Sequence, residues 1–464
     1  MFTIAAIATI TGGTVIGHHD AWVSGVSTDS RTISVRELFV PLVGPRFDGH
    51  TYIPEVSAKG VGVVLSSVEW AASHLFPAGV TAVVVPDTLQ ALGDLAAAYR
   101  ANYTLQTVGI TGSNGKTTTK EILASIMSLT GPGIKTTGNL NNLIGLPRML
   151  FQLQPVHRWA VLEMGMSEPG EIDRLAEIAR PQVGVVTNAF PAHLESMGSI
   201  ENVAKAKGEL FRRLPAGGTA IYNADDPLIA ALPTPPGVIR RSFGLTTGDV
   251  TASDVTTHGL DGMTFTLHLT ESRLPVRFHA CGRHQLANAL AAATAAEAIG
   301  VAAETIRAGL EQFHPVDRRF VVERVGHLTL IDDSYNANPA SMNAALTTLA
   351  EIKGRGRLFA ALGDMLELGP DGEHLHRRLG EQAGKVASRL YLLGDMATVV
   401  ADGARLAGLA PSAIVIGRNH EEIVTDILHL AAPDDLVLVK GSRGMGMDRL
   451  STLIRNLSHF QKET

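Results

Sequence analysis

The sequence predicts an α/β protein of three domains, and two observations carry this prediction. The chain has 464 residues, of which 45% are hydrophobic, and one hydrophobic core rarely serves more than about 250–300 residues. Short apolar runs alternate with helix-like stretches over most of the chain, which is typical of parallel sheets covered by helices on both faces. Changes in this pattern divide the chain into a small N-terminal α/β domain (1–86), a central domain with a mostly parallel sheet (87–316) and a doubly wound, Rossmann-like C-terminal domain (317–464).

The N-terminal unit contains short strand-like runs that glycine and proline separate. They read LFVPL (38–42), GVGVVLS (60–66) and TAVVVP (81–86). We therefore expect a small α/β domain with its own sheet.

The central unit begins with a helix-like stretch at 89–102 and ends with a second one at 284–299. Between them, the segment 233–280 is richer in proline, threonine and arginine and is strand-like, which predicts an antiparallel appendage. Buried strands of a parallel sheet are expected at 107–110, 160–165 and 183–188.

The C-terminal unit contains five apolar runs at intervals of roughly 20–35 residues, with helical stretches between them. Such a repeat is typical of a doubly wound sheet, in which ligands bind at the carboxyl ends of the strands. The runs are LTLIDDS (328–334), LFAALGD (358–364), LYLLGD (390–395), AIVIG (413–417) and DLVLVKG (435–441).

Composition and charge exclude several classes of protein. The net charge of −6 provides no basic surface for nucleic acid. Cys281 is the only cysteine, so no internal disulfide can form, which suits a reducing compartment. The start of the chain lacks the basic residues of a signal peptide, and the long apolar stretch 286–306 is interrupted by Glu297. We expect a cytoplasmic protein that does not insert into membranes.

The stretch TGSNGKTTTKE (111–121) has the features of a phosphate-binding loop. An apolar strand precedes it and a good helix follows it, so backbone N–H groups and the helix dipole would face a phosphate. Lys116 would neutralise the β- and γ-phosphates, and the Thr117 hydroxyl would bind Mg²⁺. The strict pattern requires its first glycine at 110, where this chain has isoleucine. A glycine and asparagine turn that caps a helix is the alternative.

Polar residues also follow the next two strands of the central unit. Glu163 ends a strand where an oxygen ligand would suit Mg²⁺, although a solvated strand end is the alternative. His193 follows strand 183–188 and is either a ligand or a structural histidine. Lys205 and Lys207 lie on an amphipathic helix, where lysines are usually solvated.

The C-terminal unit repeats this arrangement. Asp332 and Asp333 close its first strand, where they would bind ribose hydroxyls or a cation, or cap a turn. Lys440, Ser442 and Arg443 follow the last strand and together would grip a carboxylate or a phosphate, unless they form a plain surface turn. The joint placement of such residues at strand ends in two units predicts a nucleotide site that faces a second domain across a cleft.

These motifs resemble the Mur ligases of bacterial cell-wall synthesis, whose phosphate loop has its glycines placed as here. The resemblance covers residues 25 to 450 and rests on 109–121, 136–147, LEMG (162–165), AKGELF (206–211) and GRHQLANALAA (282–292). Within the family, three C-terminal motifs resemble the members that add D-alanyl-D-alanine to UDP-N-acetylmuramoyl-tripeptide, and the front motifs STDSR (27–31) and LFVPLVGPRFDGH (38–50) resemble their uridine-nucleotide-binding domain. Those C-terminal motifs are DDSYNANPASM (332–342), LGDMLELG (362–369) and VKGSRGMGMD (439–448).

The resemblance implies ATP as cosubstrate and a role for each matching residue. Lys116, Lys207 and His193 would be catalytic. Two Mg²⁺ ions would be held by Thr117, Glu163, His193 and Lys207, the last of these as a carbamate. ATP would contact Gly112, Ser113, Asn114, Gly115, Lys116, Thr117, Thr118, Asn288, Arg319 and Asp333. The other substrates would contact Ser30, Arg31, Asp48, His50, Asn139, Asn141, Asn142, Asn336, Asn338, Lys440, Ser442 and Arg443.

Two residues depart from the family pattern. Gln285 stands where asparagine is common after His284, and Arg318 stands where glycine is common before Arg319. The second departure raises the question of which arginine contacts the nucleotide.

The implied activity is ATP-dependent formation of an amide bond through an acyl phosphate, by a monomer whose partners are the tripeptide nucleotide and the dipeptide. One alternative is another amide ligase of the Mur and folylpolyglutamate superfamily. The chain lacks the DNPR-type motif of the Mur ligases that add the third residue of the peptide. A folate ligase would not need the N-terminal domain that resembles a uridine-nucleotide-binding domain. The other alternative is an ATP-dependent switch without ligation, which would not need Glu163, His193 and Lys207 together.

Overall fold

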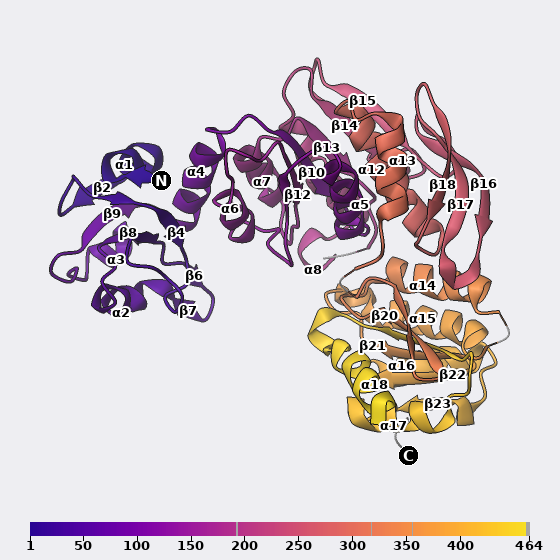
Figure 1. The fold of residues 1–464 in the computed structure, drawn as a ribbon. Helices are drawn as coiled ribbons and strands as arrows, with labels where there is room; N and C mark the ends of the chain where they lie inside the picture. Colours follow the sequence, from indigo (N-terminus) through magenta and orange to yellow (C-terminus); the bar gives the residue numbers. More distant parts are fainter. Residues whose placement is uncertain (192–193, 317, 355, 461–464) are drawn as a thin grey trace.

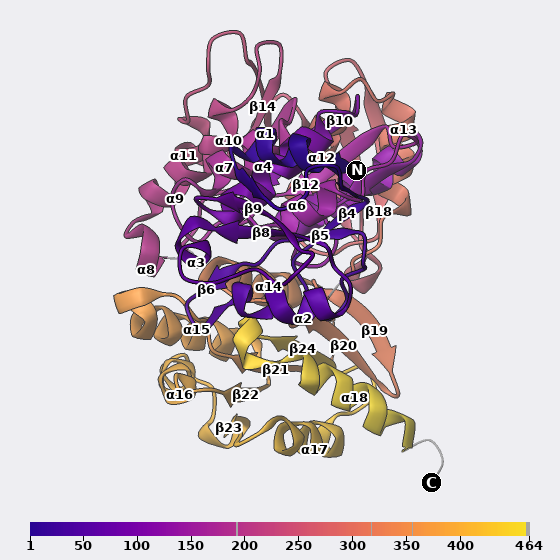
Figure 2. The ribbon, with the colours of Figure 1, turned by 90° about the vertical axis from the view of Figure 1, so that its left-hand side faces the viewer.

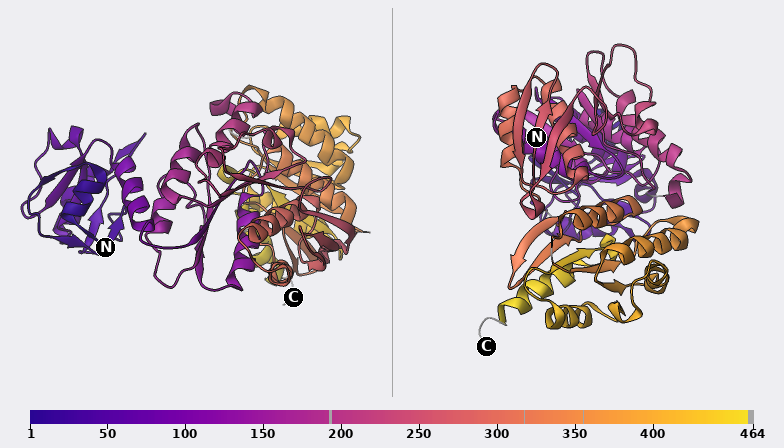
Figure 3. Two further views of the ribbon diagram at one scale, coloured as in Figure 1. Left: turned by 90° about the horizontal axis from the view of Figure 1, so that it is seen from above. Right: turned by 90° about the vertical axis from the view of Figure 1, so that its right-hand side faces the viewer.

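The computed structural model describes residues 1–191, 194–316, 318–354 and 356–460. It has three α/β parts in chain order, with the N-terminal part to one side and the C-terminal part against the middle one (Figures 1 and 3). The predicted fold class is confirmed. No helix within the described ranges is long and apolar enough to cross a membrane.

The N-terminal part is a five-stranded sheet in which only the edge strand β2 is antiparallel to its neighbour. Its apolar core includes Leu38, Leu65 and Val83, one from each predicted strand run. The strand order is β2 (Thr14–Ile16), β9 (Thr81–Val85), β8 (Val63–Ser67), β5 (Glu37–Phe39) and β4 (Gly25–Ser27), and the helices are α1 (Ile4–Thr11), α2 (Ile53–Ala58) and α3 (Val68–Ala71).

Helix α4 (Thr88–Arg100) joins this part to the next. Asp87 caps it by accepting hydrogen bonds from the backbone N–H groups of Leu89 and Gln90. Leu92 belongs to the N-terminal core, whereas Ala96 belongs to the middle core. The helix therefore packs on both sides of the predicted boundary at residue 86, which stays a prediction.

The middle part is built on a six-stranded, fully parallel sheet. Helices α4, α6, α7, α9 and α10 cover one face, and α5, α12 and α13 cover the other together with an antiparallel sheet of three strands. The antiparallel appendage predicted over 233–280 is present only at 251–278, because the strand Ile239–Phe243 of the same range pairs parallel with Thr219–Asn223 and extends the main sheet. The strands are β11 (Gly133–Lys135), β12 (Trp159–Glu163), β10 (Gln106–Thr111), β13 (Val183–Val186), β14 (Thr219–Asn223) and β15 (Ile239–Phe243) in spatial order, then β16 (Thr251–Thr257), β17 (Met263–His268) and β18 (Arg273–Phe278). The helices are α5 (Lys116–Ser128), α6 (Gly145–Leu150), α7 (Glu171–Ala179), α9 (Ile200–Lys207), α10 (Glu209–Arg212), α12 (Arg283–Ala298) and α13 (Ala303–Gln312).

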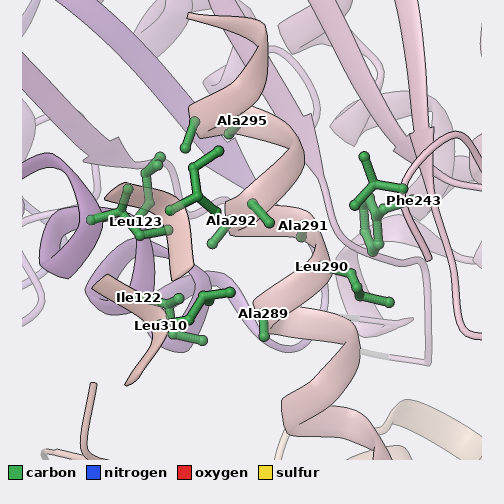
Figure 4. Packing of buried hydrophobic residues seen from close by; sticks show 14 of the residues in the cluster. Ile122, Leu123, Phe243, Ala289, Leu290, Ala291, Ala292, Ala295 and Leu310 are labelled. Atoms are coloured by element: carbon green, nitrogen blue, oxygen red, sulfur yellow. The ribbon is translucent and has the colours of Figure 1, made fainter. Parts of the chain in front are cut away.

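The alanine-rich helix α12 is a core helix, as predicted. Its Ala292 and Ala295 side chains are fully buried. Because these side chains are small, α12 packs closely beside Ile122 and Leu123 of α5, as Figure 4 shows. This packing fixes the helix that begins at Lys116 against the helix that carries Asn288.

The C-terminal part has a six-stranded sheet in which only the edge strand β19 runs antiparallel. Figure 2 shows α14 and α15 above the strands and α17 below them, and the two cores lie on opposite faces of the sheet. The strands are β19 (Val321–Val325), β20 (Leu328–Asp333), β24 (Leu436–Lys440), β21 (Leu358–Gly363), β22 (Arg389–Leu393) and β23 (Ile414–Ile416) in spatial order, and the helices are α14 (Pro339–Ile352), α15 (Gly372–Val386), α16 (Ala397–Leu406), α17 (His420–Leu430) and α18 (Asp448–Phe460).

The middle and C-terminal parts are in close contact. Leu260 and Cys281 of the middle part pack with the C-terminal core. Gly282 has a φ of +93°, and a Cβ there would lie 2.3 Å from Thr348 Oγ1 on α14. Only glycine therefore fits at this contact, which brings the first turn of α12 next to the C-terminal part.

Candidate functional site

The phosphate-type loop runs from the end of β10 to the start of α5, as the sequence predicts. Gly112 and Gly115 have φ values of +153° and +81°. A Cβ on Gly112 would lie 1.8 Å from Thr187 Oγ1, and a Cβ on Gly115 would lie 2.2 Å from Asn288 Oδ1. Ile110, the position where the strict pattern has glycine, is a buried strand residue. The tight turn therefore begins after Thr111, which explains the shifted glycine spacing.

The backbone of the loop is held by side chains that the sequence did not single out. Thr187 and Asn188 follow strand β13, and both donate hydrogen bonds to the carbonyl of Asn114, at 2.6 and 3.2 Å. Asn188 Oδ1 also accepts from the Asn114 N–H at 2.8 Å. Residues at the end of β13 therefore hold in place the loop that follows the neighbouring strand β10.

Lys116 is the first residue of α5, and its Nζ turns back into the loop. It donates to the carbonyls of Gly112 at 2.6 Å and Ser113 at 3.3 Å. Burial lowers its pKa, although the Glu163 carboxylate opposes this effect. The ammonium group is therefore placed within the loop, where a phosphate would replace the carbonyls as its partner.

Glu163 lies at the end of β12, buried among polar groups. Its carboxylate accepts from Thr117 Oγ1 at 2.7 Å and from Asn141 Nδ2 at 2.8 Å. A carboxylate and a hydroxyl at this distance are oxygen ligands of the kind that Mg²⁺ takes together with phosphate oxygens. The described residues contain no group of three or more histidine, cysteine, aspartate or glutamate side chains that could hold a metal alone. His193 lies outside the described residues.

Lys120 is a buried cation of this cluster that sequence reasoning missed. Its side chain is 1% exposed. Its Nζ donates to the Thr136 carbonyl at 2.7 Å and lies 3.0 Å from Glu121 and 4.0 Å from Glu163. The helical spacing of Lys120 from Lys116, one turn away, was the available signal.

We expect Lys120→Met to destabilise the protein by about 3–5 kcal/mol, because it removes the buried cation beside the buried Glu163 carboxylate and leaves the Thr136 carbonyl without its donor. The matched control is Lys135→Met, since Lys135 also pairs with Glu121 but is 41% exposed. Its cost should stay below about 1 kcal/mol. Urea unfolding of both variants measures the difference, and equal costs would contradict a special role for Lys120.

Lys207 is the last residue of α9 and is buried, although a lysine on such a helix was expected to be solvated. Burial, with Lys116 nearby, holds its pKa well below the usual value. The neighbouring Lys205 is exposed. The two lysines of this helix therefore differ in exposure, and of these two, Lys207 faces the site.

The C-terminal part contributes the opposite wall. Burial raises the pKa of Asp333, while Lys440 Nζ, 2.6 Å away, opposes this effect. The Arg319 guanidinium lies 4.0 Å from the centre of the Tyr335 ring, and its buried Nε has no hydrogen-bond partner in the part of the chain that the structure describes. An unpaired buried donor of this kind is suited to an acceptor on a ligand.

The two departures from the family pattern have structural explanations. Arg318 has a φ of +58°, the left-handed conformation that favours glycine. It points to Asp448 in an exposed ion pair, whereas Arg319 faces the site. Gln285 Oε1 accepts from Asn288 Nδ2 at 3.2 Å and so orients that amide.

One cavity of about 1220 Å³ between the middle and C-terminal parts gathers most of the predicted residues. Ser442 is buried beside it but does not line it. The predicted residues that line it are Gly112, Ser113, Asn114, Gly115, Lys116, Thr117, Thr118, Asn139, Asn141, Asn142, Glu163, Lys207, Asn288, Arg319, Asp333, Asn336, Asn338, Lys440 and Arg443.

The four predicted residues of the N-terminal part do not line this cavity. His50 is fully buried, with Asp48 Oδ1 2.6 Å from one ring nitrogen and the Ser67 N–H donating to the other at 2.9 Å. Arg31 is exposed and pairs with Asp29, and the Ser30 carbonyl accepts from Lys59. Binding of a substrate by these residues stays a prediction.

Asn114 and Asn338 connect the two walls of the cavity. Each side-chain amide donates to the other, at 2.7 and 3.1 Å. Asn338 also caps α14 by accepting from the Ser341 N–H. The pair therefore links the phosphate loop directly to a helix of the C-terminal part.

Asn338→Asp should keep the helix cap, because aspartate caps as well as asparagine, but it loses the N–H that Asn114 accepts. A lost hydrogen bond of about 1 kcal/mol should raise amide exchange in the loop roughly five-fold. Hydrogen–deuterium exchange of peptides that cover 112–116 measures this effect. Ser341→Ala is the control, since it alters the cap and keeps the amide pair, and equal exchange in both variants would contradict the link.

Comparison with known proteins identifies the family. Residues 23–100 match the Mur ligase family catalytic domain, 110–296 match the Mur ligase middle domain, and 318–443 match the domain described as Mur ligase, glutamate ligase. The chain belongs to the Mur ligase family. These matches follow the chain in the order of its three structural parts.

Full-length relatives of this Mur ligase carry a common name. The UDP-N-acetylmuramoyl-tripeptide–D-alanyl-D-alanine ligases of Escherichia coli and Bacillus subtilis are 36% and 34% identical, and each match covers 97% of both chains. A crystal structure of MurF from Acinetobacter baumannii superposes with a TM-score of 0.88 at 31% identity, covering 98% of this chain and 99% of the other. MurF from Thermotoga maritima in complex with ADP gives 0.84 at 27% identity, covering 94% and 98%.

Proposed function

We propose that this Mur ligase uses ATP to join D-alanyl-D-alanine to UDP-N-acetylmuramoyl-tripeptide, with ADP and phosphate as the other products. The observation that carries the proposal is the cavity in which a phosphate loop faces the strand ends of a second domain. The full-length relatives named for this reaction support it. The predicted cytoplasmic location and monomeric state belong to the same proposal.

The chain supplies the groups that phosphoryl transfer needs. A carboxylate does not react with an amine at a useful rate, so the γ-phosphate of ATP would first convert the tripeptide carboxylate to an acyl phosphate. Lys116, already held within the loop, would bind the transferring phosphoryl group, and the loop N–H groups would orient it. The amine of the dipeptide would then attack the acyl carbon and displace phosphate.

Thr117 and Glu163 fit the site of a Mg²⁺ ion, because both place oxygen atoms beside the loop. Bound Mg²⁺ would neutralise charge on the phosphate oxygens. Asn141 would keep the Glu163 carboxylate in place through its hydrogen bond. His193 and Lys207 remain the proposed ligands of a second ion.

Lys207 would take part as a carbamate. Its neutral amine would attack CO₂ and lose a proton, which replaces a potential cation with an anion. The lowered pKa supports this proposal, because only the neutral amine reacts with CO₂. A carbamate oxygen would suit a cation, whereas an ammonium group would not.

The test measures phosphate release from ATP with UDP-N-acetylmuramoyl-tripeptide, with and without D-alanyl-D-alanine, and identifies the product by mass. Release that needs both substrates, together with the pentapeptide product, is expected. Release that is indifferent to the dipeptide would overturn the proposal in favour of another amide ligase or an ATP-dependent switch.

A further inference from the structure

The sequence predicts that Lys440, Ser442 and Arg443, after β24, together bind an anion. The structure shows that these three residues have different surroundings. Lys440 is buried and already pairs with Asp333, and its Nζ also donates to the Asn336 carbonyl at 3.0 Å. Ser442 Oγ accepts from the Leu366 N–H at 2.9 Å and donates to the Ala337 carbonyl at 3.2 Å. Both groups hold the C-terminal part together.

Arg443 differs from these two residues. Its backbone N–H donates to Asn336 Oδ1 at 3.2 Å, which fixes its position. Its exposed side chain lines the cavity, with the guanidinium carbon 5.6 Å from the centre of the Tyr335 ring. Within the described ranges, its guanidinium forms no ion pair and no hydrogen bond.

The charge of the acceptor explains what this cation would bind. An amine that attacks an acyl phosphate has lost its proton, so a dipeptide in its reactive form carries the net negative charge of its carboxylate. The loop side of the cavity already has Lys116 and a helix N-terminus for phosphates. Arg443 is on the opposite wall, and a guanidinium binds a carboxylate through two parallel hydrogen bonds.

We propose that Arg443 binds the terminal carboxylate of the incoming acceptor and thereby selects peptides with a free carboxyl end. This inference rests on the proposed function. A dipeptide spans about 7 Å when extended, so its carboxylate would lie well away from the reacting amine. Arg443 would therefore determine which acceptor binds without taking part in the chemical step.

The test compares D-alanyl-D-alanine with its C-terminal amide as acceptors for the wild type and for Arg443→Gln. The wild type should lose about 10–100-fold in kcat/KM when the carboxylate becomes an amide. Arg443→Gln should lose a similar factor with the free acid and almost nothing further with the amide. The KM values for ATP and for the tripeptide nucleotide should not change.

Two further variants sharpen the result. Arg443→Lys should recover part of the discrimination, because lysine keeps the charge and loses the planar fork. Arg418→Gln, which removes another exposed arginine of the C-terminal part, should behave as wild type. Equal use of both acceptors by the wild type, or equal losses with both in Arg443→Gln, would overturn this inference alone. Absence of product from the wild type would overturn the proposed function as well.

Discussion

Lys116→Ala is expected to abolish ligation and leave the fold intact. In the structure, Nζ donates only to two carbonyls of its own loop among the described residues. During catalysis, its partner would be the phosphoryl group that is being transferred. Loss of one positioned charge at such a group lowers the reaction rate about 10³-fold or more. Phosphate release with both substrates should fall by at least this factor.

The stability of the same variant provides the control. Burial lowers the pKa of Lys116 in the folded state. At pH values below the pKa of this lysine in the unfolded chain, burial of the ammonium group therefore reduces the stability of the fold. The cost of this burial diminishes as the pH rises through the folded pKa. At neutral pH, Lys116→Ala should therefore unfold in urea at the wild-type midpoint or above it. Lys205→Ala, in which an exposed lysine is removed, should retain full activity, and near-normal turnover of Lys116→Ala would contradict the role of the loop.

The local features of the site were predictable from the sequence because they depend on neighbours in the chain. The loop follows an apolar strand and precedes a helix, and Glu163 ends another strand. Parallel strands bring such ends to one edge of a sheet. The antiparallel appendage and the buried alanine-rich helix followed from composition in the same way.

Contacts between distant segments were not predictable in this way. Lys440 pairs with Asp333 because β20 and β24 are neighbours in register, and the strand order cannot be read from one sequence. The burial of Lys120 and Lys207 depends on which helix face meets the sheet. Helical spacing places lysines on a polar face by default, so tertiary packing overrode that expectation here.

Lys207→Ala should lose about 10²–10⁴-fold in ligation, a loss typical of a removed active-site group. The side chain is buried, faces the cavity and, among the described residues, has no hydrogen-bond partner for its Nζ. A carbamate would fill this place with a carboxylate-like group. The truncated side chain leaves room for a small acid, so added formate or acetate should restore part of the activity.

A readout independent of turnover separates the carbamate from a plain structural lysine. Wild-type protein equilibrated with ¹³C-bicarbonate should show a carbamate resonance in ¹³C spectra, and Lys207→Ala should not. Lys207→Arg should remain inactive, since a guanidinium stays charged and does not react with CO₂. Lys205→Ala should keep both the resonance and the activity, because Lys205 is exposed on the same helix. An unchanged rate in Lys207→Ala would exclude the carbamate, whereas acid rescue of that variant but not of Lys116→Ala would establish that an anion is needed at this position.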